Sequence, residues 1–250
     1  MKMVRAGMLH DLLSYGLDEH GQLRDPIARP EQFKDSPTGR IPRGWSAGAI
    51  TEIAFVNPST PAKELNPFSL VSFIPMQDVD EEAQWVYQQV RRLIDCGGGY
   101  TPFYDGDILF AKITPCMENG KGCHATNLKN GFGLGSTEFH VLRPKVSSSG
   151  RFIFHLIMTE RLRRKAVAYM TGSAGQQRVE SSFFGNFIIA IPPKEEQEYI
   201  ANIIDELDDQ ISFSKKEVAK LRYQKYGLTT DLLSGQAPVP ETMFGETETA

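Results

Sequence analysis

The clearest pattern in the chain is a run of apolar residues spaced three and four apart towards its C-terminal end. Pro192 and Pro193 open this stretch, acidic side chains follow at once, and the next Gly or Pro is Gly227. Proline at a helix start and acids in the first turn are typical of a helix N-terminus. The pattern therefore predicts one long helix that begins directly after Pro193.

The apolar residues of this helix follow a heptad repeat. With Ile200 taken as position a, eight of the ten a and d positions up to Leu232 are apolar. A repeat of this kind over about five heptads needs a partner helix along its length, which predicts a coiled-coil seam. The alternative is that the stripe packs on the chain's own globular domain. The predicted dimerisation residues are Ile200, Ile204, Leu207, Ile211, Val218, Leu221, Leu228 and Leu232.

Upstream of this helix the patterns are shorter. Residues 1–14 predict a short helical piece, and residues 18–44 are rich in Pro, Gly and charge, which is typical of a linker on the surface. From about Trp45 onward, short runs of β-type residues such as 68–74 and 187–191 alternate with Pro and Gly. The fold class predicted is α+β: a mixed, mostly β domain followed by a long coiled-coil-forming α-helix.

Eight residues near the N-terminus return near the C-terminus. The segments 7–14 and 227–234 share Gly, Asp, Leu, Leu and Ser at a constant offset of 220 residues. Internal similarity at a fixed spacing indicates a repeated structural unit. The pattern predicts that the chain starts with the end of one repeat unit and finishes with the end of the next.

Four segments carry a family resemblance: the linker-like run 33–45, the turn and strand Gly106-Asp107-Ile108-Leu109, the helix start 191–198 and the repeated segment 227–234. Together they resemble the specificity (S) subunit of type I restriction-modification enzymes, in a half-length form with one target-recognition domain. The resemblance covers nearly the whole chain and is least specific in its central part.

The resemblance implies a sequence-specific DNA recognition subunit that reads one half of a bipartite target in double-stranded DNA. It implies a scaffold for methylation (M) subunits and for restriction (R) motor and nuclease subunits, and a homodimer in which each chain supplies the other's missing helix. The implied domains are an N-terminal helical piece and linker at 1–44, a target-recognition domain at 45–191, a conserved spacer helix at 192–235 and a C-terminal tail, expected to be disordered, at 236–250.

The sequence lacks the common catalytic fingerprints, such as a phosphate-binding loop, a Gly-x-Ser-x-Gly turn or a His-Glu-x-x-His pair. We therefore expect no enzymatic activity and no cofactor, with catalysis by partner methyltransferase and restriction subunits. Cys116, Cys123 and His124 lack a fourth ligand, so no metal site is expected. No apolar run reaches 18 residues, and a soluble, cytoplasmic protein is expected.

Charge is distributed unevenly along the chain. The net charge is −4, but residues 101–190 carry 11 basic and 6 acidic side chains, a net +5. A DNA duplex favours Lys and Arg that displace its counterions, so this segment is expected to face nucleic acid. The alternative is a mildly basic surface on a structural or interaction protein that dimerises through its helix and never binds DNA.

Three segments supply the predicted DNA contacts. The Gly-rich stretch 115–135 permits close backbone approach, a basic run on a predicted helix over 152–171 suits phosphates, and Gln and Arg in 172–178 suit base edges. The alternatives are a plain loop, a solvated charged face and a docking or packing segment. The predicted DNA-binding residues are Lys112, Asn119, Lys121, His124, Lys129, Arg161, Arg163, Arg164, Lys165, Gln176, Gln177 and Arg178.

Overall fold

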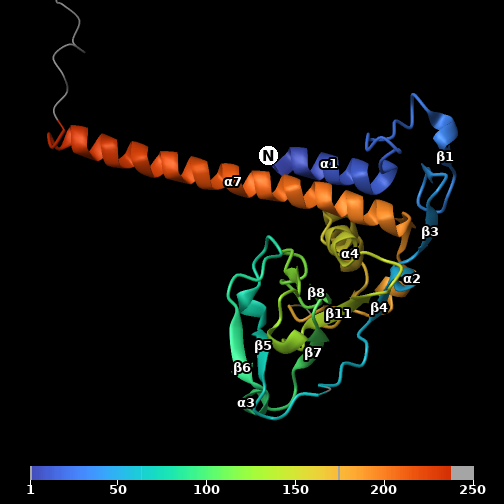
Figure 1. Cartoon of the computed structure of the whole chain (residues 1–250), viewed down its shortest axis with the longest axis horizontal. Helices are drawn as coiled ribbons and strands as arrows, with labels where there is room; N and C mark the ends of the chain where they lie inside the picture. The colour runs from blue at the N-terminus through green and yellow to red at the C-terminus, as the bar shows by residue number, and fades with distance from the viewer. Residues whose placement is uncertain (1, 63, 174, 238–250) are drawn as a thin grey trace, which may run out of the picture. The chain divides into compact units, whose positions relative to one another are not determined.

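The computed structural model describes residues 2–62, 64–173 and 175–237. The chain divides into two compact units: the larger is Ala6–Ile204, and the smaller combines Met1–Arg5 with Asp205–Ala250. Two helices, α1 (Lys2–Tyr15) and α7 (Lys194–Leu233), each contribute residues to both units. Figure 1 follows the chain from its blue N-terminal helix to the orange and red of α7.

The segment that follows α1 packs partly on the core of the larger unit. Its strands β1 (Phe33–Lys34) and β2 (Ile41–Pro42) pair antiparallel after the 3-10 turn η1 (Pro30–Gln32). Leu17 and Ile41 are 5% and 3% exposed and join the main apolar cluster. The expectation of a linker lying only on the surface was therefore wrong, because apolar residues between the prolines and glycines reach the core.

Two four-stranded sheets form the centre of the larger unit. The order of the first is β6 (Gln89–Arg92), β5 (Leu70–Ile74), β10 (Phe132–Gly135), β7 (Thr101–Tyr104). The order of the second is β4 (Ala54–Val56), β11 (Phe139–Pro144), β8 (Ile108–Ala111), β9 (Gly122–His124). Neighbouring strands run antiparallel except β5 and β10, which are parallel with Leu134 opposite Phe73.

Apolar side chains from both sheets meet in one cluster. It contains Phe103 of β7, Leu109 of β8 and Val141 of β11. All four residues of β8 are buried, so this strand is a continuous apolar run with no polar face. Gly133 makes room for the Phe103 ring, because a Cβ at this position would lie 2.1 Å from a ring carbon. This core fixes β8, and with it the start of the loop that follows.

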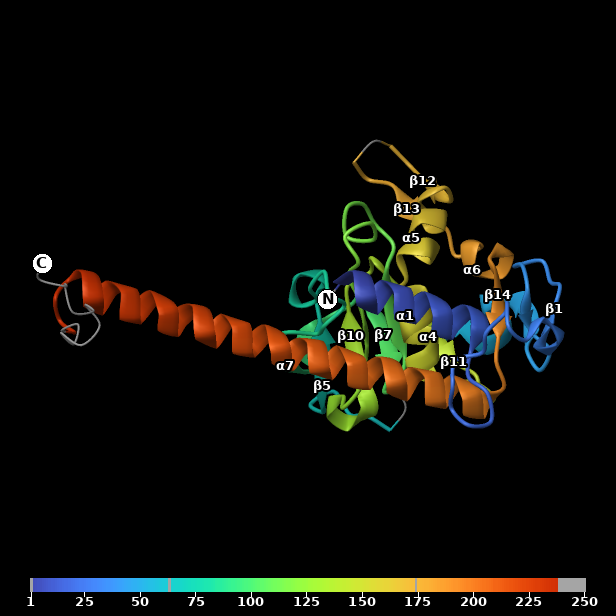
Figure 2. The same cartoon turned by 90° about the horizontal axis from the view of Figure 1, so that it is seen from above.

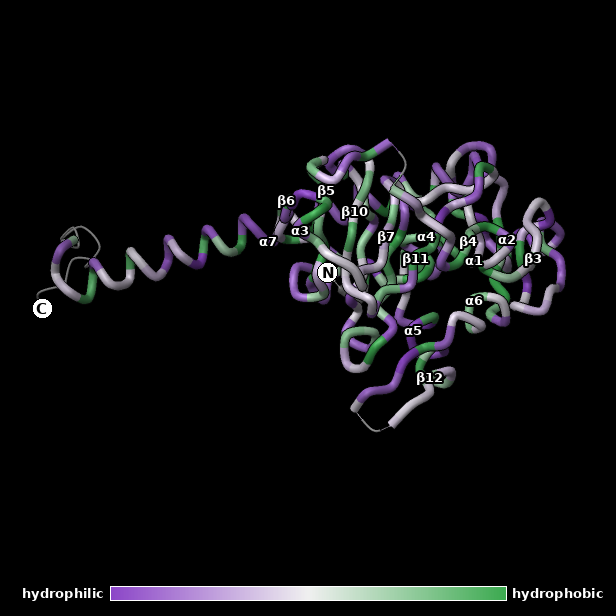
Figure 3. Tube along the Cα trace, turned by 90° about the horizontal axis from the view of Figure 1, so that it is seen from below, coloured by the Kyte–Doolittle hydropathy of each residue, from purple (hydrophilic) through white to green (hydrophobic). Residues whose placement is uncertain are grey.

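Shorter elements complete the larger unit. They are the paired strands β3 (Ser46–Ala49) and β14 (Ile188–Ile191), the strand pair β12 (Met170–Thr171) and β13 (Arg178–Val179), and the helical turns α2 (Ile50–Ile53), η2 (Met76–Asp78), α3 (Leu93–Cys96), η3 (Lys129–Gly131) and α6 (Phe183–Asn186). Figure 3 shows apolar positions, in green, gathered along the strands and along α4.

The region predicted as one helix over 152–171 forms two helices. The first, α4 (Gly150–Ile157), begins after the N-cap Ser149, and α5 (Glu160–Val167) begins after the N-cap Thr159. Each cap side chain accepts a backbone N–H of the following turn, which is why Ser and Thr favour this position. The prediction of a single helix was wrong because a second start signal lies inside the stretch.

The predicted long helix is confirmed. Helix α7 begins directly after Pro193 and runs for 40 residues, which corresponds to about 60 Å at 1.5 Å per residue. The predicted fold class, α+β with a mixed, mostly β domain and a long C-terminal helix, is confirmed as well.

The first two residues of the predicted seam belong to the core of the larger unit. Ile200 and Ile204 are 0% and 1% exposed and lie in the same apolar cluster as Leu9 and Leu12 of α1. Their prediction as dimerisation residues was therefore wrong, and the alternative of packing on the chain's own domain holds for these turns. Four later seam residues, all in the smaller unit, are at least 40% exposed: Val218, Leu221, Leu228 and Leu232.

Among the described residues, no helix is both long enough and apolar enough to cross a membrane. From residue 238 onward the predicted C-terminal tail lies outside the described residues. The other predicted domain bounds remain predictions.

Candidate nucleic-acid interface

Predicted DNA-binding residues from two distant parts of the chain lie side by side. Just beyond β8, the carbonyl oxygen of Lys112 accepts the Val179 N–H at 2.9 Å, and the Thr114 N–H donates to the carbonyl of Gln177 at 3.0 Å. The residues that follow β8 thus pair with β13 and the residue before it through a ladder of main-chain hydrogen bonds. We call this ladder, residues 112–114 with 177–179, the paired segments. It brings together candidate base-reading residues that are far apart in the sequence.

Arg178 lies within the paired segments, bridged to Ile113. Its Nε donates to Oε2 of Glu138 at 2.9 Å and its Nη2 to Oε1 at 2.8 Å. The hydrogen bond from Arg178 is the main reason that the pKa of Glu138 is lowered, and the same bond raises the pKa of Arg178. If Arg178 reads a base edge through these two nitrogens, it must first release Glu138.

The loop after β8, residues 113–121, is tied down by two of the predicted DNA-binding side chains. Lys121 Nζ donates to the carbonyl oxygen of Met76 at 3.2 Å, and Asn119 Nδ2 donates to Oε1 of Glu81 at 2.9 Å. We call this segment the reading loop. It is a plain loop in secondary structure, but it is packed against residues 76–81 and has a defined shape.

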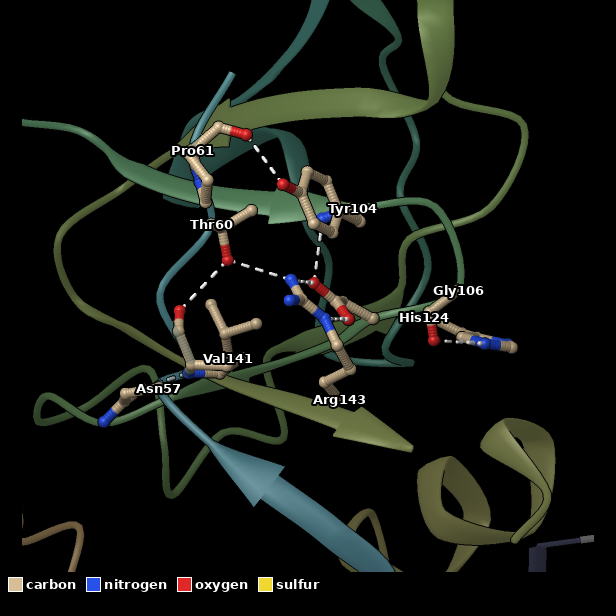
Figure 4. A network of polar contacts seen from close by, with 10 residues as sticks. Asn57, Thr60, Pro61, Tyr104, Gly106, His124, Val141 and Arg143 are labelled. Carbon is tan, nitrogen blue, oxygen red and sulfur yellow. Dashed lines mark hydrogen bonds and ion pairs between the residues drawn. The ribbon is translucent and has the colours of Figure 1, made fainter. Parts of the chain in front are cut away.

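Two predicted DNA-binding residues lie away from the paired segments. His124 pairs with Ile108 at the opposite end of β8, and its ring stacks on Phe154 with centroids 6.1 Å apart. Its Nε2 lies 3.2 Å from the carbonyl oxygen of Gly106, as Figure 4 shows. Lys129 begins η3, which is anchored to the other sheet by a bond from the Lys129 N–H to Ser72 Oγ at 2.9 Å.

Three of the four basic residues of α5 face outward. Arg161, Arg164 and Lys165 line an open surface hollow of about 550 Å³ together with Glu160 and Ala168. Arg164 pairs with Glu160, but both side chains are about three-quarters exposed, and such a pair contributes little to stability. Helix α5 leads directly into the β12–β13 pair, as Figure 2 shows, and Met170 of β12 lies opposite Val179 of the paired segments.

Arg163, the fourth basic residue, points inward and is only 6% exposed. Its Nη2 donates to the carbonyl oxygens of Gly120 at 3.0 Å and Lys121 at 3.1 Å, and its guanidinium lies 4.8 Å from the centre of the Phe110 ring. Burial lowers its pKa to about 10, so it remains a cation at neutral pH. The prediction that Arg163 grips a phosphate was wrong, because the side chain is buried and its two terminal nitrogens are bonded inside the domain.

An ion pair between the buried Asp107 and the partly exposed Arg143 holds the turn that starts β8. Asp107, 1% exposed, accepts from Arg143 through Nε at 2.8 Å and Nη2 at 2.7 Å. The Tyr104 N–H donates to the same carboxylate at 2.8 Å, and Arg143 also donates to Thr60 Oγ1 at 2.8 Å (Figure 4). This pair raises the pKa of Arg143. Sequence reasoning missed the role of Arg143, because no local spacing connects it to Asp107.

No group of three or more His, Cys, Asp or Glu side chains that could hold a metal ion occurs in the part of the chain that the structure describes. Cys123 is fully buried, and burial raises the pKa of its thiol to about 12.

A family model described as the type I restriction modification DNA specificity domain matches residues 42–223. The chain belongs to this family. Among curated specificity subunits, it is 33% identical to the EcoAI subunit of Escherichia coli over 224 residues, 86% of this chain and 38% of that subunit. It is 37% identical to the EcoEI subunit of Escherichia coli over 176 residues, 70% of this chain and 29% of that subunit. The chain therefore spans less than half the length of these relatives.

Solved structures related to this specificity-domain chain share its fold. One, described as the structural basis of complex assembly and conformational transition of the type I R-M system, has a TM-score of 0.58 and 18% identity, covering 93% of this chain and 53% of that one. The HsdS subunit from Thermoanaerobacter tengcongensis has a TM-score of 0.51 and 17% identity, covering 92% of this chain and 52% of that one. The resemblance inferred from the sequence is thus confirmed for family and fold.

Proposed function

We propose that this chain is a sequence-specific DNA recognition subunit of a type I restriction-modification system, acts in the cytoplasm and reads one half of a bipartite target. The observation that carries the proposal is the junction of α5, which has the exposed basic face, with the β12–β13 pair, whose second strand belongs to the paired segments. Base readers and phosphate contacts have different tasks, because phosphate contacts set register and base-edge contacts set specificity. This junction supplies side chains of both kinds on one part of the specificity domain.

The proposed roles follow from exposure and chemistry. Arg161, Arg164 and Lys165 contact phosphates, since they line the open hollow on α5. Base edges are contacted from the reading loop, from the paired segments and from the residue that precedes 177–179, where amide, ammonium and guanidinium groups suit base recognition. His124 and Lys129 are left as peripheral contacts. The proposed base-reading residues are Lys112, Asn119, Lys121, Gln176, Gln177 and Arg178.

We propose further that M and R subunits supply methylation, translocation and cleavage, and that this chain is their scaffold. Family membership supports this division of roles, as does the fold shared with a solved structure that concerns complex assembly of the type I R-M system. The purified chain is therefore expected to transfer no methyl group and to cut no DNA. Measurable activity in the chain alone, with methyl donor, Mg²⁺ and ATP present, would contradict this division.

Two copies of the chain are proposed to associate through the part of α7 in the smaller unit. Its apolar heptad residues Leu221 and Leu228 are 62% and 59% exposed, and a heptad seam of this kind needs a partner helix. An antiparallel pairing would give a two-fold homodimer, whose symmetry would be matched by inverted half-sites in the DNA. Each specificity domain would then read one half-site.

The test of DNA binding is a salt series with fluorescent duplex DNA. The variant Arg161→Ala/Arg164→Ala/Lys165→Ala should bind all duplexes more weakly, and its salt slope should be lower by about one per lost phosphate contact. A matched control removes three cations from α7 with Lys216→Ala/Lys220→Ala/Arg222→Ala and should keep the wild-type slope. Equal slopes for the two variants would exclude the α5 face as the phosphate site.

The second candidate function is an interaction protein that dimerises through α7 and does not bind DNA. The exposed apolar residues of α7 favour this candidate, because they suit a protein partner and not a phosphate backbone. A dimer that shows no salt-dependent affinity for duplex DNA would support this function and contradict the first.

A further inference from the structure

Arg163 is a buried cation whose two terminal nitrogens donate to three main-chain carbonyl groups, and Nη2 also contacts Met158 Sδ at 2.6 Å. Its Nη1 donates to the carbonyl oxygen of Met117, and its Nη2 donates to those of Gly120 and Lys121. Among the described residues it makes no ion pair with a carboxylate, and burial alone accounts for its lowered pKa. Burial of a charge is costly unless the group is hydrogen-bonded. The two terminal nitrogens of Arg163 meet most of this need by bonding three carbonyls of the reading loop, while its buried Nε has no hydrogen-bond partner in the described part of the chain.

The reading loop has little slack where Arg163 holds it. Met117 is fully buried, and Gly120 has a φ of +89°, a conformation that L side chains rarely adopt. A Cβ at Gly120 would lie 2.8 Å from the carbonyl oxygen of Glu81. The loop is therefore pressed between residues 76–81 on one side and the guanidinium of Arg163 on the other.

Arg163 also links the loop to the basic face of α5. The same helix turn carries Arg163 inward and Arg164 outward, since the side chain of Arg164 is 77% exposed. A displacement of α5 against the loop would have to break the bonds of Arg163 to three carbonyl oxygens. The loop that carries Asn119 and Lys121 is thus fixed relative to the helix face that carries Arg161 and Arg164.

We propose that Arg163 is a positioning residue for base discrimination, an inference that rests on the proposed DNA-reading function. By holding the backbone at 117–121, it sets the distance between the phosphate-contacting face of α5 and the base-reading side chains of Asn119 and Lys121. Base readout depends on such placement, because a recognition site loses selectivity when its side chains are about 1 Å out of position. Arg163 itself touches neither phosphate nor base.

The experiment compares the full chain with Arg163→Met, Arg163→Lys and the matched control Arg164→Met. One readout is the affinity ratio between a duplex selected by the wild-type chain from a random library and a scrambled duplex. A second is the salt slope on the scrambled duplex. A third is amide hydrogen exchange at 117–121 in the protein without DNA.

For Arg163→Met, we expect faster exchange at 117–121, a fall of about tenfold in the affinity ratio and an unchanged salt slope. Arg163→Lys should be intermediate, because an ammonium group keeps the charge but lacks the planar fork. Arg164→Met should show the reverse: wild-type exchange and affinity ratio, with a salt slope lower by about one. A merely structural role would change exchange and stability but leave the affinity ratio intact.

A wild-type affinity ratio in a folded Arg163→Met variant would overturn the proposal. If that variant fails to fold, the same result in Arg163→Lys with faster loop exchange would overturn it. Unchanged loop exchange in both variants would overturn it as well. Absence of any selected sequence for the wild-type chain would instead defeat the proposed function, so the two failures can be told apart.

Discussion

The inner side of the proposed recognition surface and the outer faces of α5 and α7 use similar residues in opposite ways. Arg163 is buried and Arg143 is partly buried, and both bond groups of the chain itself, whereas Arg161 and Arg164 line an open hollow. The inner cations hold backbone segments in place, and the outer ones leave donors for an anion. The exposure and the hydrogen-bond partners of an arginine therefore distinguish a supporting role from a contacting role, although the amino-acid type is the same.

The largest expected effect concerns the outer face of α7. Leu221→Asp/Leu228→Asp should abolish the homodimer, because two carboxylates in an apolar seam would be desolvated without partners. Sedimentation or light scattering at micromolar concentration measures the mass. The control Tyr223→Asp/Thr230→Asp adds the same charge away from the heptad positions and should remain dimeric. A monomeric wild-type chain would contradict the proposed association through α7.

The next effect concerns the inner side. Arg143→Met should destabilise the fold by about 3 kcal/mol, because it leaves the buried Asp107 carboxylate without its counter-charge. Urea unfolding measures the loss. Arg164→Met on the outer face should change the stability by less than about 0.5 kcal/mol, since its partner Glu160 is exposed as well. Similar losses of unfolding free energy in Arg143→Met and Arg164→Met would mean that burial does not distinguish the inner arginines from the outer ones.

The smallest expected effect depends on pH. His140 lies behind the paired segments with Nε2 2.8 Å from the carbonyl oxygen of Val179, and burial is the main cause that lowers its pKa. The pKa of His140 in the unfolded chain, about 6.5, is therefore above its pKa in the folded chain. The stabilisation that comes from keeping this imidazole neutral is fully present above the unfolded-state pKa. It is lost as the pH falls through the folded-state pKa. Urea midpoints for wild type should decline from about pH 7 to about pH 5 more steeply than those for His140→Gln. Parallel declines would contradict this assignment.

Local sequence signals predicted the long helix well. Pro193 indicated where it begins, and the spacing of apolar residues indicated that the segment is helical. This spacing could not show where α7 leaves the core, because Ile200 and Leu221 occupy equivalent heptad positions although one is buried and the other exposed. The break between α4 and α5 was missed although Thr159 followed by Glu160 is a helix-start signal.

The site was predictable in its composition and less so in its geometry. The basic run from Arg161 to Lys165 was found, but the inward turn of Arg163 depends on helix phase, with Leu162 and Ala166 buried beside it. The contact of the reading loop with α5 and the Arg178–Glu138 pair join residues distant in sequence. No local pattern encodes such contacts, because they arise when the sheets and helices pack.

The paired segments are joined by bonds between Lys112 and Val179 and between Thr114 and Gln177, and in each bond both donor and acceptor belong to the main chain. Every residue other than proline supplies the same two main-chain groups. Apart from Val179, which is buried in the core, the side chains at these positions can therefore be exchanged while the ladder that presents them stays intact. If these side chains read DNA, as proposed, new target sequences can be read by altering surface side chains without a new backbone framework to support them.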